Sequence, residues 1–267
     1  MPAQTHAIES QGAKLHVEVE GPENAPVLML SNSLGTNLHM WDTQVPAFTK
    51  HFRLVRYDSR GHGKSAAPKG PYSIEMLGRD AIAIMDALKL KTVNWCGLSK
   101  GGMVGMWLGT NAPERIGQLV LSNTASQMTA ARDVWTQRIE AVQKGGMAAI
   151  ANGTVERWFT KGFREKAQDQ VAPVREMLLS TDPQGYIGCC EAIRDMDQGE
   201  SIRRITAPTL IIAGKEDPAT TMEAANFMHE RIKGSKLTAL DAAHISNIEQ
   251  PQAYTDAVMG HVMQKAA

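Results

Sequence analysis

The sequence predicts an α/β protein built on a mostly parallel, doubly wound sheet with a helical cap insertion. Strand and helix patterns alternate through residues 1–124, and the same alternation resumes after residue 204. Alternating strands and helices form a parallel sheet that helices cover on both faces. We therefore predict a sheet domain formed by residues 1–124 and 204–267, and a helical cap formed by residues 125–203.

Runs of apolar residues predict the strands of the first part. Residues 14–20 alternate between apolar and polar side chains, as in a strand with one face in solvent. Residues 26–31 are almost continuously apolar, which is typical of a strand covered on both faces. Further strands are expected at residues 52–57, 92–98 and 116–122.

Helices are predicted among these strands. Residues 74–88 carry apolar side chains at helical spacing, and Ser73 is a suitable N-cap because its hydroxyl can accept a backbone N–H. Another helix is expected over residues 103–111. Pro113 ends it, because proline lacks the N–H that a continuing helix needs.

The remaining elements follow from the same patterns. In the cap, helices are expected over residues 132–144 and 149–160, and no strand is predicted. After the cap we expect strands at residues 209–213 and 235–240, each followed by a helix, at residues 221–231 and 252–262.

Composition limits what this protein can do. Lys+Arg and Asp+Glu both number 28, so the chain lacks the basic excess that binds nucleic acids or anionic membrane surfaces. The first residues show no signal peptide, and no apolar run approaches the ~18 residues of a membrane span. The three cysteines suit neither a disulfide framework nor a metal site. We expect a soluble, cytoplasmic protein with no metal and no nucleic-acid or membrane partner.

The strongest functional signal is GLSKGG at residues 97–102, between a predicted strand and a predicted helix. A G-x-S-x-G sequence at such a junction is typical of a nucleophile elbow, a strained turn that exposes a serine hydroxyl above the sheet. The glycines leave room there for the neighbouring chain. We expect Ser99 to be a nucleophile.

A serine hydroxyl needs a base that takes its proton and an acid that orients the base. On a sheet of this kind the acid follows the serine in the chain, and the histidine follows the acid. Asp217 comes just after the strand at 209–213 and His244 just after the strand at 235–240, so both have the required order and position. We predict the triad Ser99, Asp217 and His244.

Other polar residues compete with the predicted acid. Glu216 is adjacent to Asp217 but should point elsewhere from the turn. Asp241 is so close to His244 in the chain that it should not reach behind the imidazole. Asn123 also ends a strand, but a neutral amide cannot serve as the acid.

Acyl transfer also needs backbone N–H groups that stabilise the developing oxyanion. One should come from Lys100, the residue after the nucleophile. The second should come from the loop at residues 31–36, in which we choose the N–H of Leu34.

With these motifs the chain is identified as a member of the α/β-hydrolase fold family. YDSRGHGKS at residues 57–65 resembles the family's D-x-R-G-x-G-x-S turn, which Arg60 and His62 should fix. LSKGG at residues 98–102 resembles its elbow, and His244 with the following Glu249 resembles its histidine loop.

Within the family, residues 31–41, 96–109 and 112–125 are similar to 3-oxoadipate enol-lactonases. NSLG at residues 32–35 is the most telling, because it stands where most relatives have His-Gly. The resemblance implies hydrolysis of 3-oxoadipate enol-lactone to 3-oxoadipate through an acyl-enzyme on Ser99, in the β-ketoadipate pathway of aromatic catabolism. It calls for no cofactor.

The resemblance also implies a carboxylate on the substrate. Arg132 or Arg138 could receive it, and Trp135 and Trp158 could line the pocket or pack the cap helices. Lys100 departs from the family pattern, which often has an apolar residue there. Its side chain either attracts the substrate carboxylate at the pocket mouth or pairs with an acidic residue of the cap.

Other functions share these residues. A general carboxylesterase, a carbon–carbon bond hydrolase or a perhydrolase would use the same site, since cap shape decides among them. A ligand receptor on the same fold is the alternative outside enzymes. The sequence leaves the oligomeric state open.

Overall fold

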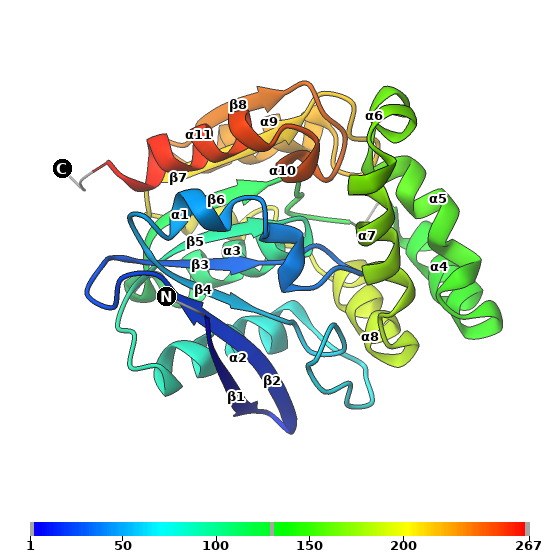
Figure 1. Ribbon diagram of the computed structural model, residues 1–267, viewed down its shortest axis with the longest axis horizontal. Helices are drawn as coiled ribbons and strands as arrows, with labels where there is room; N and C mark the ends of the chain where they lie inside the picture. The colour runs from blue at the N-terminus through cyan, green and yellow to red at the C-terminus, as the bar shows by residue number, and fades with distance from the viewer. Residues whose placement is uncertain (1–2, 129–130, 265–267) are drawn as a thin grey trace.

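The computed structural model describes residues 3–128 and 131–264 and contains one eight-stranded sheet (Figure 1). The strands lie in the order β1-β2-β4-β3-β5-β6-β7-β8. They are β1 (Gln4–Ser10), β2 (Ala13–Glu20), β3 (Val27–Ser31), β4 (Arg53–Tyr57), β5 (Val93–Leu98), β6 (Ile116–Ser122), β7 (Thr209–Gly214) and β8 (Lys236–Leu240).

The sheet is parallel from β4 to β8 and antiparallel at one edge. β1 pairs antiparallel with β2, and β2 pairs antiparallel with β4. Every later pair is parallel, so the carboxyl ends of β3, β5, β6, β7 and β8 lie along the same edge of the sheet. Polar groups that follow these strands are therefore brought together.

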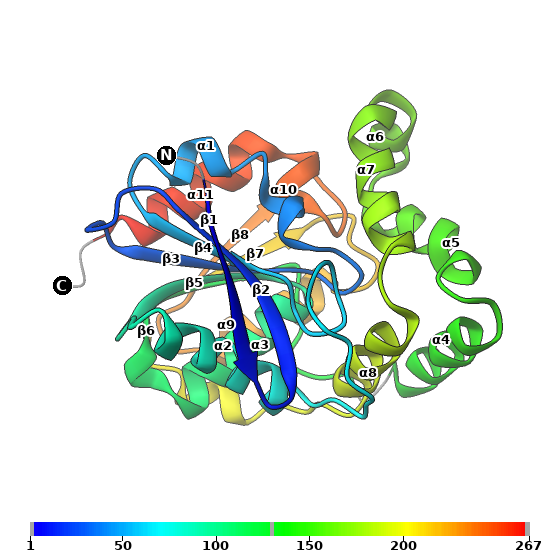
Figure 2. The same cartoon turned by 60° about the horizontal axis from the view of Figure 1, so that its bottom comes forward.

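Helices cover both faces of the sheet, as a doubly wound fold requires. Figure 2 shows α1, α10 and α11 on one face and α2, α3 and α9 on the other. These helices are α1 (Val45–Phe48), α2 (Ile74–Ala87), α3 (Lys100–Asn111), α9 (Met222–Arg231), α10 (Ser246–Glu249) and α11 (Pro251–Val262). Short 3-10 helices are η1 (Leu38–Trp41), η2 (Pro113–Arg115) and η4 (Ser201–Arg204).

Every predicted strand is present, but the edge strand β1 was not predicted. Its pattern is QTHAIES, in which only Ile8 and Ser10 are buried. A half-exposed edge strand with so few apolar residues gives no alternation to detect. Its place is decided by pairing with β2, from Gln4 opposite Val19 to Ser10 opposite Ala13.

The predicted helices are also present, with bounds that differ from the prediction by a few residues. The Ser73 hydroxyl accepts the Met76 N–H, so the predicted N-cap of α2 is confirmed. Helix α3 begins at Lys100 rather than at residue 103. The glycines at its start make a helix unattractive by propensity, and tertiary packing overrides that preference.

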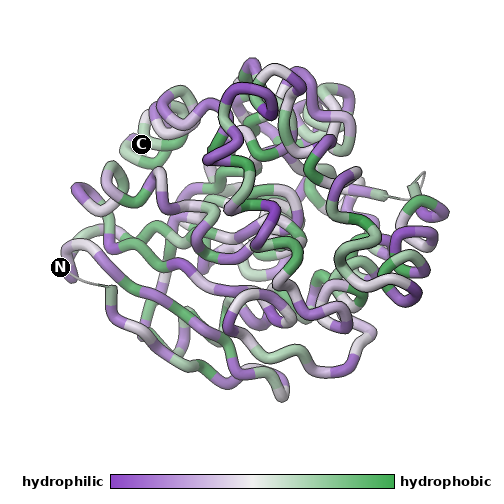
Figure 3. The backbone as a smooth tube through the Cα atoms, turned by 45° about the vertical axis from the view of Figure 1, so that its right-hand side comes forward, coloured by the Kyte–Doolittle hydropathy of each residue, from purple (hydrophilic) through white to green (hydrophobic). Residues whose placement is uncertain are grey.

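A second group of helices, α4–α8, lies beyond the sheet edge to which the arrows of β3 and β5 point (Figure 1). We call them the insertion helices: α4 (Arg132–Gly145), α5 (Ala148–Trp158), α6 (Lys161–Lys166), α7 (Gln168–Leu179) and α8 (Pro183–Arg194). Figure 3 shows hydrophilic and hydrophobic residues alternating along them, as in helices that bury one face. Helix α5 ends before the predicted residue 160, because the Thr160 side chain caps α6. The boundaries of the cap as a separate unit stay a prediction.

The core lies between the sheet and its two helical layers. The central strands β5, β6 and β7 are buried along nearly their whole length. Within the described residues no helix has both the length and the apolar content needed to cross a membrane. Because the central strands are closely packed, the carboxyl ends of β3, β5, β6, β7 and β8 are held rigidly next to the insertion helices.

Candidate active site

Ser99 sits at the tight turn between β5 and α3. Its backbone angles are φ 56° and ψ −114°, a conformation that a non-glycine residue rarely adopts. The turn is close-packed, because a Cβ added at Gly97 would collide with the carbonyl of Gly101. A strained residue held by such packing is typical of a functional site.

The backbone donors predicted for the oxyanion lie free near Ser99. Lys100 is the first residue of α3, so its N–H has no partner in the preceding turn. Over the described residues, neither the N–H of Lys100 nor that of Leu34 donates to another protein group. Leu34 and Ser99 line the same cavity. Both N–H groups are thus available to a ligand.

His244 and Asp217 are joined by a short hydrogen bond. With Nδ1 protonated, His244 donates to Oδ2 of Asp217 across 2.7 Å, and both side chains are buried. This bond leaves Nε2 of His244 unprotonated, as a general base requires. His244 and Ser99 line one cavity, without a direct hydrogen bond between these two described side chains. Catalytic hydrogen bonds are often long before a substrate binds.

The carboxylate of Asp217 is held in place by further donors. Oδ1 accepts the backbone N–H groups of Ala219 at 2.8 Å and Thr220 at 3.0 Å, and Oδ2 accepts the Thr220 hydroxyl at 2.6 Å. Burial by itself raises the pKa of Asp217, but His244 and the Thr220 hydrogen bonds outweigh it and lower the pKa to about 2. Asp217 is therefore a fixed, ionised partner of His244.

The rival carboxylates lie elsewhere. Asp241 is exposed and pairs with the Lys215 ammonium at 2.6 Å. Glu216 is exposed, although its neighbour Asp217 is buried. The turn after β7 therefore points only the second of these adjacent carboxylates at His244.

Asn123 has a supporting place that the sequence reasoning did not foresee. Its amide donates to Oδ2 of Asp217 at 3.1 Å and to the Ala243 carbonyl at 3.0 Å. Its own oxygen accepts the Ser246 hydroxyl at 2.6 Å. As a neutral amide at the end of β6, it links the acid to the histidine loop. Position at a strand end was the only signal of this in the sequence.

The histidine loop is anchored by Glu249 and by the insertion. Glu249 accepts the Ala243 N–H at 3.0 Å and the hydroxyl and N–H of Thr160. The Ile245 N–H donates to the Trp158 carbonyl at 2.9 Å. The histidine loop is thus bonded to Trp158 at the end of α5 and to Thr160 at the start of α6, so the insertion helps to place His244.

A cavity of about 540 Å³ lies between Ser99 and the insertion helices. His244, Ser33 and Leu34 line it on the sheet side. On the insertion side, its lining includes Met128, Trp135, Arg138, Ile150, Arg157 and Trp158. Apolar walls with a few charged groups are typical of a pocket for a small molecule.

Two arginines of the insertion face this cavity. Arg138 lies over the ring of Trp135, at 5.2 Å from the ring centroid, and donates to the Tyr186 hydroxyl at 3.3 Å. Arg157 donates to the Thr154 hydroxyl at 3.3 Å. Burial and then the nearby charge of Arg138 lower the pKa of Arg157. Neither arginine forms an ion pair with a carboxylate in the described parts of the chain.

Of the four predicted substrate-binding residues, three line the cavity: Trp135, Arg138 and Trp158. Arg132 is not brought to it. Its side chain is 60% exposed and pairs with Asp195 at 2.9 Å. Arg132 lies at the start of α4, and the helical twist turns it away from the face that carries Arg138. Arg157 was missed, because a single arginine among many charged residues carries no periodic signal.

The Lys100 side chain contradicts both expectations for it. It is 1% exposed and its charge acts on His62; Asp58 and Cys189 lie near it, and it is not among the residues that line the cavity. No ion pair joins it to a carboxylate within the described ranges, and burial lowers its pKa. An ammonium so enclosed neither waits at the pocket mouth nor pairs with an acidic residue of the insertion.

Metal-ligating residues do not cluster in the part of the chain that the structure describes. No group of three or more His, Cys, Asp or Glu lies close enough there to hold an ion. The arrangement of Ser99, His244 and Asp217 is one in which a hydroxyl, an imidazole and a carboxylate can act as nucleophile, base and orienting acid in acyl transfer.

The sequence and the fold of this chain are similar to those of known proteins. Residues 26–251 match the family described as alpha/beta hydrolase fold. The chain is 41% identical to 3-oxoadipate enol-lactonase 2 of Acinetobacter baylyi, over 94% of each chain, and 38% identical to enol-lactonase 1 of that organism, again over 94% of each. The crystal structure of the enol-lactonase from Burkholderia xenovorans superposes with a TM-score of 0.94 at 40% identity, covering 98% of this chain and 100% of that one.

Proposed function

The chain belongs to the α/β-hydrolase fold family and is a hydrolase, and from this premise we propose that it opens 3-oxoadipate enol-lactone to 3-oxoadipate. In this proposal Ser99 is the nucleophile, His244 the general base and Asp217 the orienting acid. The high identity to two enol-lactonases along nearly the whole chain supports the choice of substrate.

In the first half of the reaction, Ser99 Oγ attacks the lactone carbonyl while Nε2 of His244 takes its proton. The backbone N–H groups of Leu34 and Lys100 donate to the oxyanion that develops. The hydrogen bond of 2.7 Å from His244 to Asp217 stabilises the imidazolium. The ring C–O bond then breaks, and the leaving enol oxygen takes the proton from His244, which is neutral again before the second half.

In the second half, a water molecule attacks the acyl-enzyme, and His244 again accepts the proton. The C–O bond to Ser99 breaks, and the serine recovers its proton from His244. The enol tautomerises to the ketone, so one lactone and one water give one 3-oxoadipate. Neither half requires a cofactor or a metal.

Arg138 and Arg157 are the observation that supports a substrate with a carboxylate. Both line the cavity that holds Ser99 and His244, and neither is neutralised by a described carboxylate. Two close guanidinium groups repel each other, and a carboxylate between them relieves this through charge-assisted hydrogen bonds. The enol-lactone carries such a carboxylate, whereas a simple ester does not.

Turnover of the purified protein tests the proposal. We expect rapid hydrolysis of 3-oxoadipate enol-lactone with release of 3-oxoadipate, and slower turnover of short p-nitrophenyl esters. Ser99→Ala should abolish both reactions and leave the fold intact, because the hydroxyl buries little surface. Turnover of the esters alone would favour a general carboxylesterase, and no turnover of either would favour a receptor.

We also place this reaction in the cytoplasm. The cysteines Cys96, Cys189 and Cys190 are all free. Unpaired thiols suit a reducing compartment. The substrate is a small molecule, and the proposal involves no nucleic acid.

A further inference from the structure

His62 holds the loop that carries one of the proposed oxyanion donors. We call residues 32–38 the oxyanion loop; it follows β3 and ends at Leu38, the first residue of η1. The Gly35 N–H donates to Nε2 of His62 across 2.9 Å, and the His62 side chain is 1% exposed. Gly35 directly follows Leu34, so this bond fixes the peptide plane next to the Leu34 N–H.

The bond defines the protonation state of His62. Because Nε2 accepts a hydrogen bond from the Gly35 N–H, the ring proton lies on Nδ1, and Nδ1 donates to the Arg60 carbonyl at 3.1 Å. A protonated imidazolium has no lone pair for Gly35. The hydrogen bond therefore exists only while His62 is neutral.

Burial, helped by the charge of Lys100, keeps His62 neutral. Burial and then the ammonium of Lys100 lower the pKa of His62 to about 3, although the Arg60 carbonyl opposes them. The nearby carboxylates are already engaged: Asp80 binds the Arg60 guanidinium through bonds of 2.6 Å, and Asp58 accepts backbone N–H groups. Cys189 of α8 donates to the same Arg60 carbonyl, and burial raises the pKa of its thiol. The buried Lys100 thus has a physical effect on this site, since its charge favours neutral His62.

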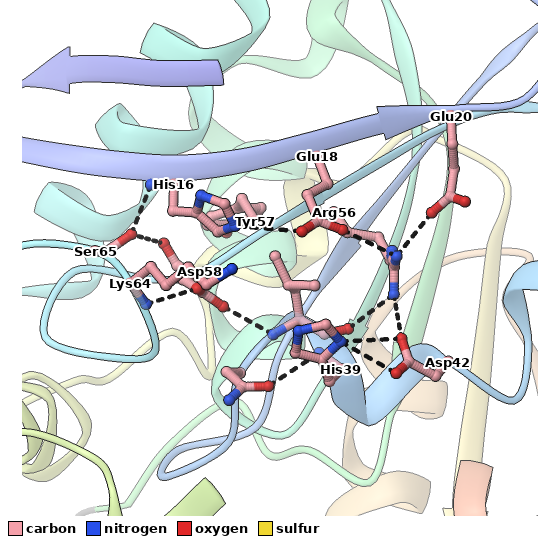
Figure 4. Close-up of polar contacts among 12 residues, drawn as sticks. His16, Glu18, Glu20, His39, Asp42, Arg56, Tyr57, Asp58, Lys64 and Ser65 are labelled. Atoms are coloured by element: carbon pink, nitrogen blue, oxygen red, sulfur yellow. Dashed lines mark hydrogen bonds and ion pairs between the residues drawn. The ribbon is translucent and has the colours of Figure 1, made fainter. Parts of the chain in front are cut away.

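The oxyanion loop is also held at its end, at Leu38. Asp58 accepts the Leu38 N–H at 2.8 Å, and Arg56 donates to the Leu38 carbonyl at 3.3 Å. Figure 4 shows Arg56 between Asp42 and the strand glutamates Glu18 and Glu20, which hold its guanidinium.

On the opposite side, the insertion closes over Gly35. A Cβ there would meet the side chains of Leu178, Tyr186 and Trp158. His62 thus supplies the hydrogen bond in the middle of a loop that is packed from above and tied at its end.

We propose that His62 is a positioning residue of the hydrolysis: its imidazole holds Gly35 so that the Leu34 N–H points at the carbonyl oxygen of the substrate. This inference rests on the proposed function, in that Ser99 forms an oxyanion that Leu34 stabilises. His62 acts on the transition state through the loop and does not touch the substrate.

The test compares His62→Leu, which removes the acceptor, with His62→Gln, which keeps an acceptor oxygen on a side chain of similar reach. His261→Leu is the matched control, since His261 is another buried histidine, bonded to the Pro208 carbonyl far from the site. Each variant is assayed on the enol-lactone and on p-nitrophenyl acetate, with near-ultraviolet circular dichroism to measure the folded fraction.

For His62→Leu we expect kcat per folded molecule to fall on the order of 10-fold to 10³-fold on both substrates, with KM changed less than about twofold. The inhibition constant of phenylboronic acid, which forms a tetrahedral adduct on serine, should rise in parallel. That of 3-oxoadipate, a ground-state ligand, should stay constant. His62→Gln should recover much of the loss, and His261→Leu should show none.

Unchanged boronate affinity in His62→Leu would overturn the proposal, as would an equal loss of kcat in His261→Leu. If His62→Leu does not fold, His62→Asn replaces it, because its shorter amide does not reach the Gly35 N–H; wild-type kcat and boronate affinity in His62→Asn would contradict the acceptor role, and losses that His62→Gln recovers would support it. A wild type active on p-nitrophenyl acetate but not on the lactone would refute the substrate, while the ester still tests His62.

Discussion

At the scale of single residues, the carboxylate of Asp217 accepts hydrogen bonds from several groups besides His244. His244, Thr220, Ala219 and Asn123 all donate to it, and its pKa lies near 2. Each donor depends on the carboxylate remaining an acceptor at both oxygens. An amide at this position would present an N–H₂ group to at least one donor.

Asp217→Asn should therefore lower kcat by on the order of 10³-fold to 10⁴-fold, because His244 loses the acceptor that sets its tautomer. Steady-state kinetics on the enol-lactone measure this loss. Asp241→Asn is the control, since Asp241 is exposed and bound to Lys215. A larger loss in Asp241→Asn than in Asp217→Asn would show that the acid is misassigned.

At the scale of elements, helix α4 presents two arginines to different surroundings. Arg138 faces the cavity beside Arg157 of α5, and Arg132 faces solvent and Asp195. Helices α4 and α5 pack together, so Arg138 and Arg157 lie on the same side of the cavity. Substituting Arg132 therefore shows the effect of removing a positive charge from α4, and substituting Arg138 or Arg157 shows, in addition, any role in binding the substrate.

Arg138→Gln and Arg157→Gln should each raise KM for the enol-lactone about 10-fold to 100-fold, the loss expected for a charge-assisted hydrogen bond. KM for p-nitrophenyl acetate should stay near its wild-type value, and added salt should weaken the effect on the lactone.

Arg132→Gln is the matched control on the same helix and should change neither KM. Equal losses on the charged lactone and the neutral ester would contradict carboxylate binding and indicate that the arginines only pack the insertion.

At the scale of the whole molecule, buried histidines make stability depend on pH. Burial lowers the pKa of His62 to about 3, below its ordinary value of 6.5. Between these values the unfolded chain binds a proton at this residue and the folded chain does not. The free energy of unfolding therefore rises with pH across this window and falls on acidification, by up to about 1.4 kcal/mol per pH unit.

Urea unfolding between pH 6.5 and pH 4.5 measures this dependence. We expect the midpoint to fall with pH in the wild type and to fall less steeply in His62→Gln, which removes the titrating group. Below pH 4, protonation of Asp217 adds to the loss, since its folded pKa lies near 2 and its ordinary value is 3.8. Identical slopes in the two proteins would mean that His62 titrates normally in the folded state.

The sequence by itself determined the features that depend on neighbours in the chain. The apolar runs fixed the strands, the Ser73 hydroxyl fixed the start of α2, and the glycines around Ser99 marked the elbow. The order of Ser99, Asp217 and His244 followed because each comes after a strand whose carboxyl end faces the same edge. Such signals survive in a single sequence because they are local or periodic.

Only the tertiary structure decided which groups meet across the fold. It turned Asp217 inward and left Asp241 in solvent, brought Arg157 to the cavity in place of Arg132, and buried Lys100 beside His62. The edge strand β1 likewise exists through its pairing with β2. These contacts join residues far apart in the chain, and their free energy comes from burial and charge that no local pattern of residues specifies.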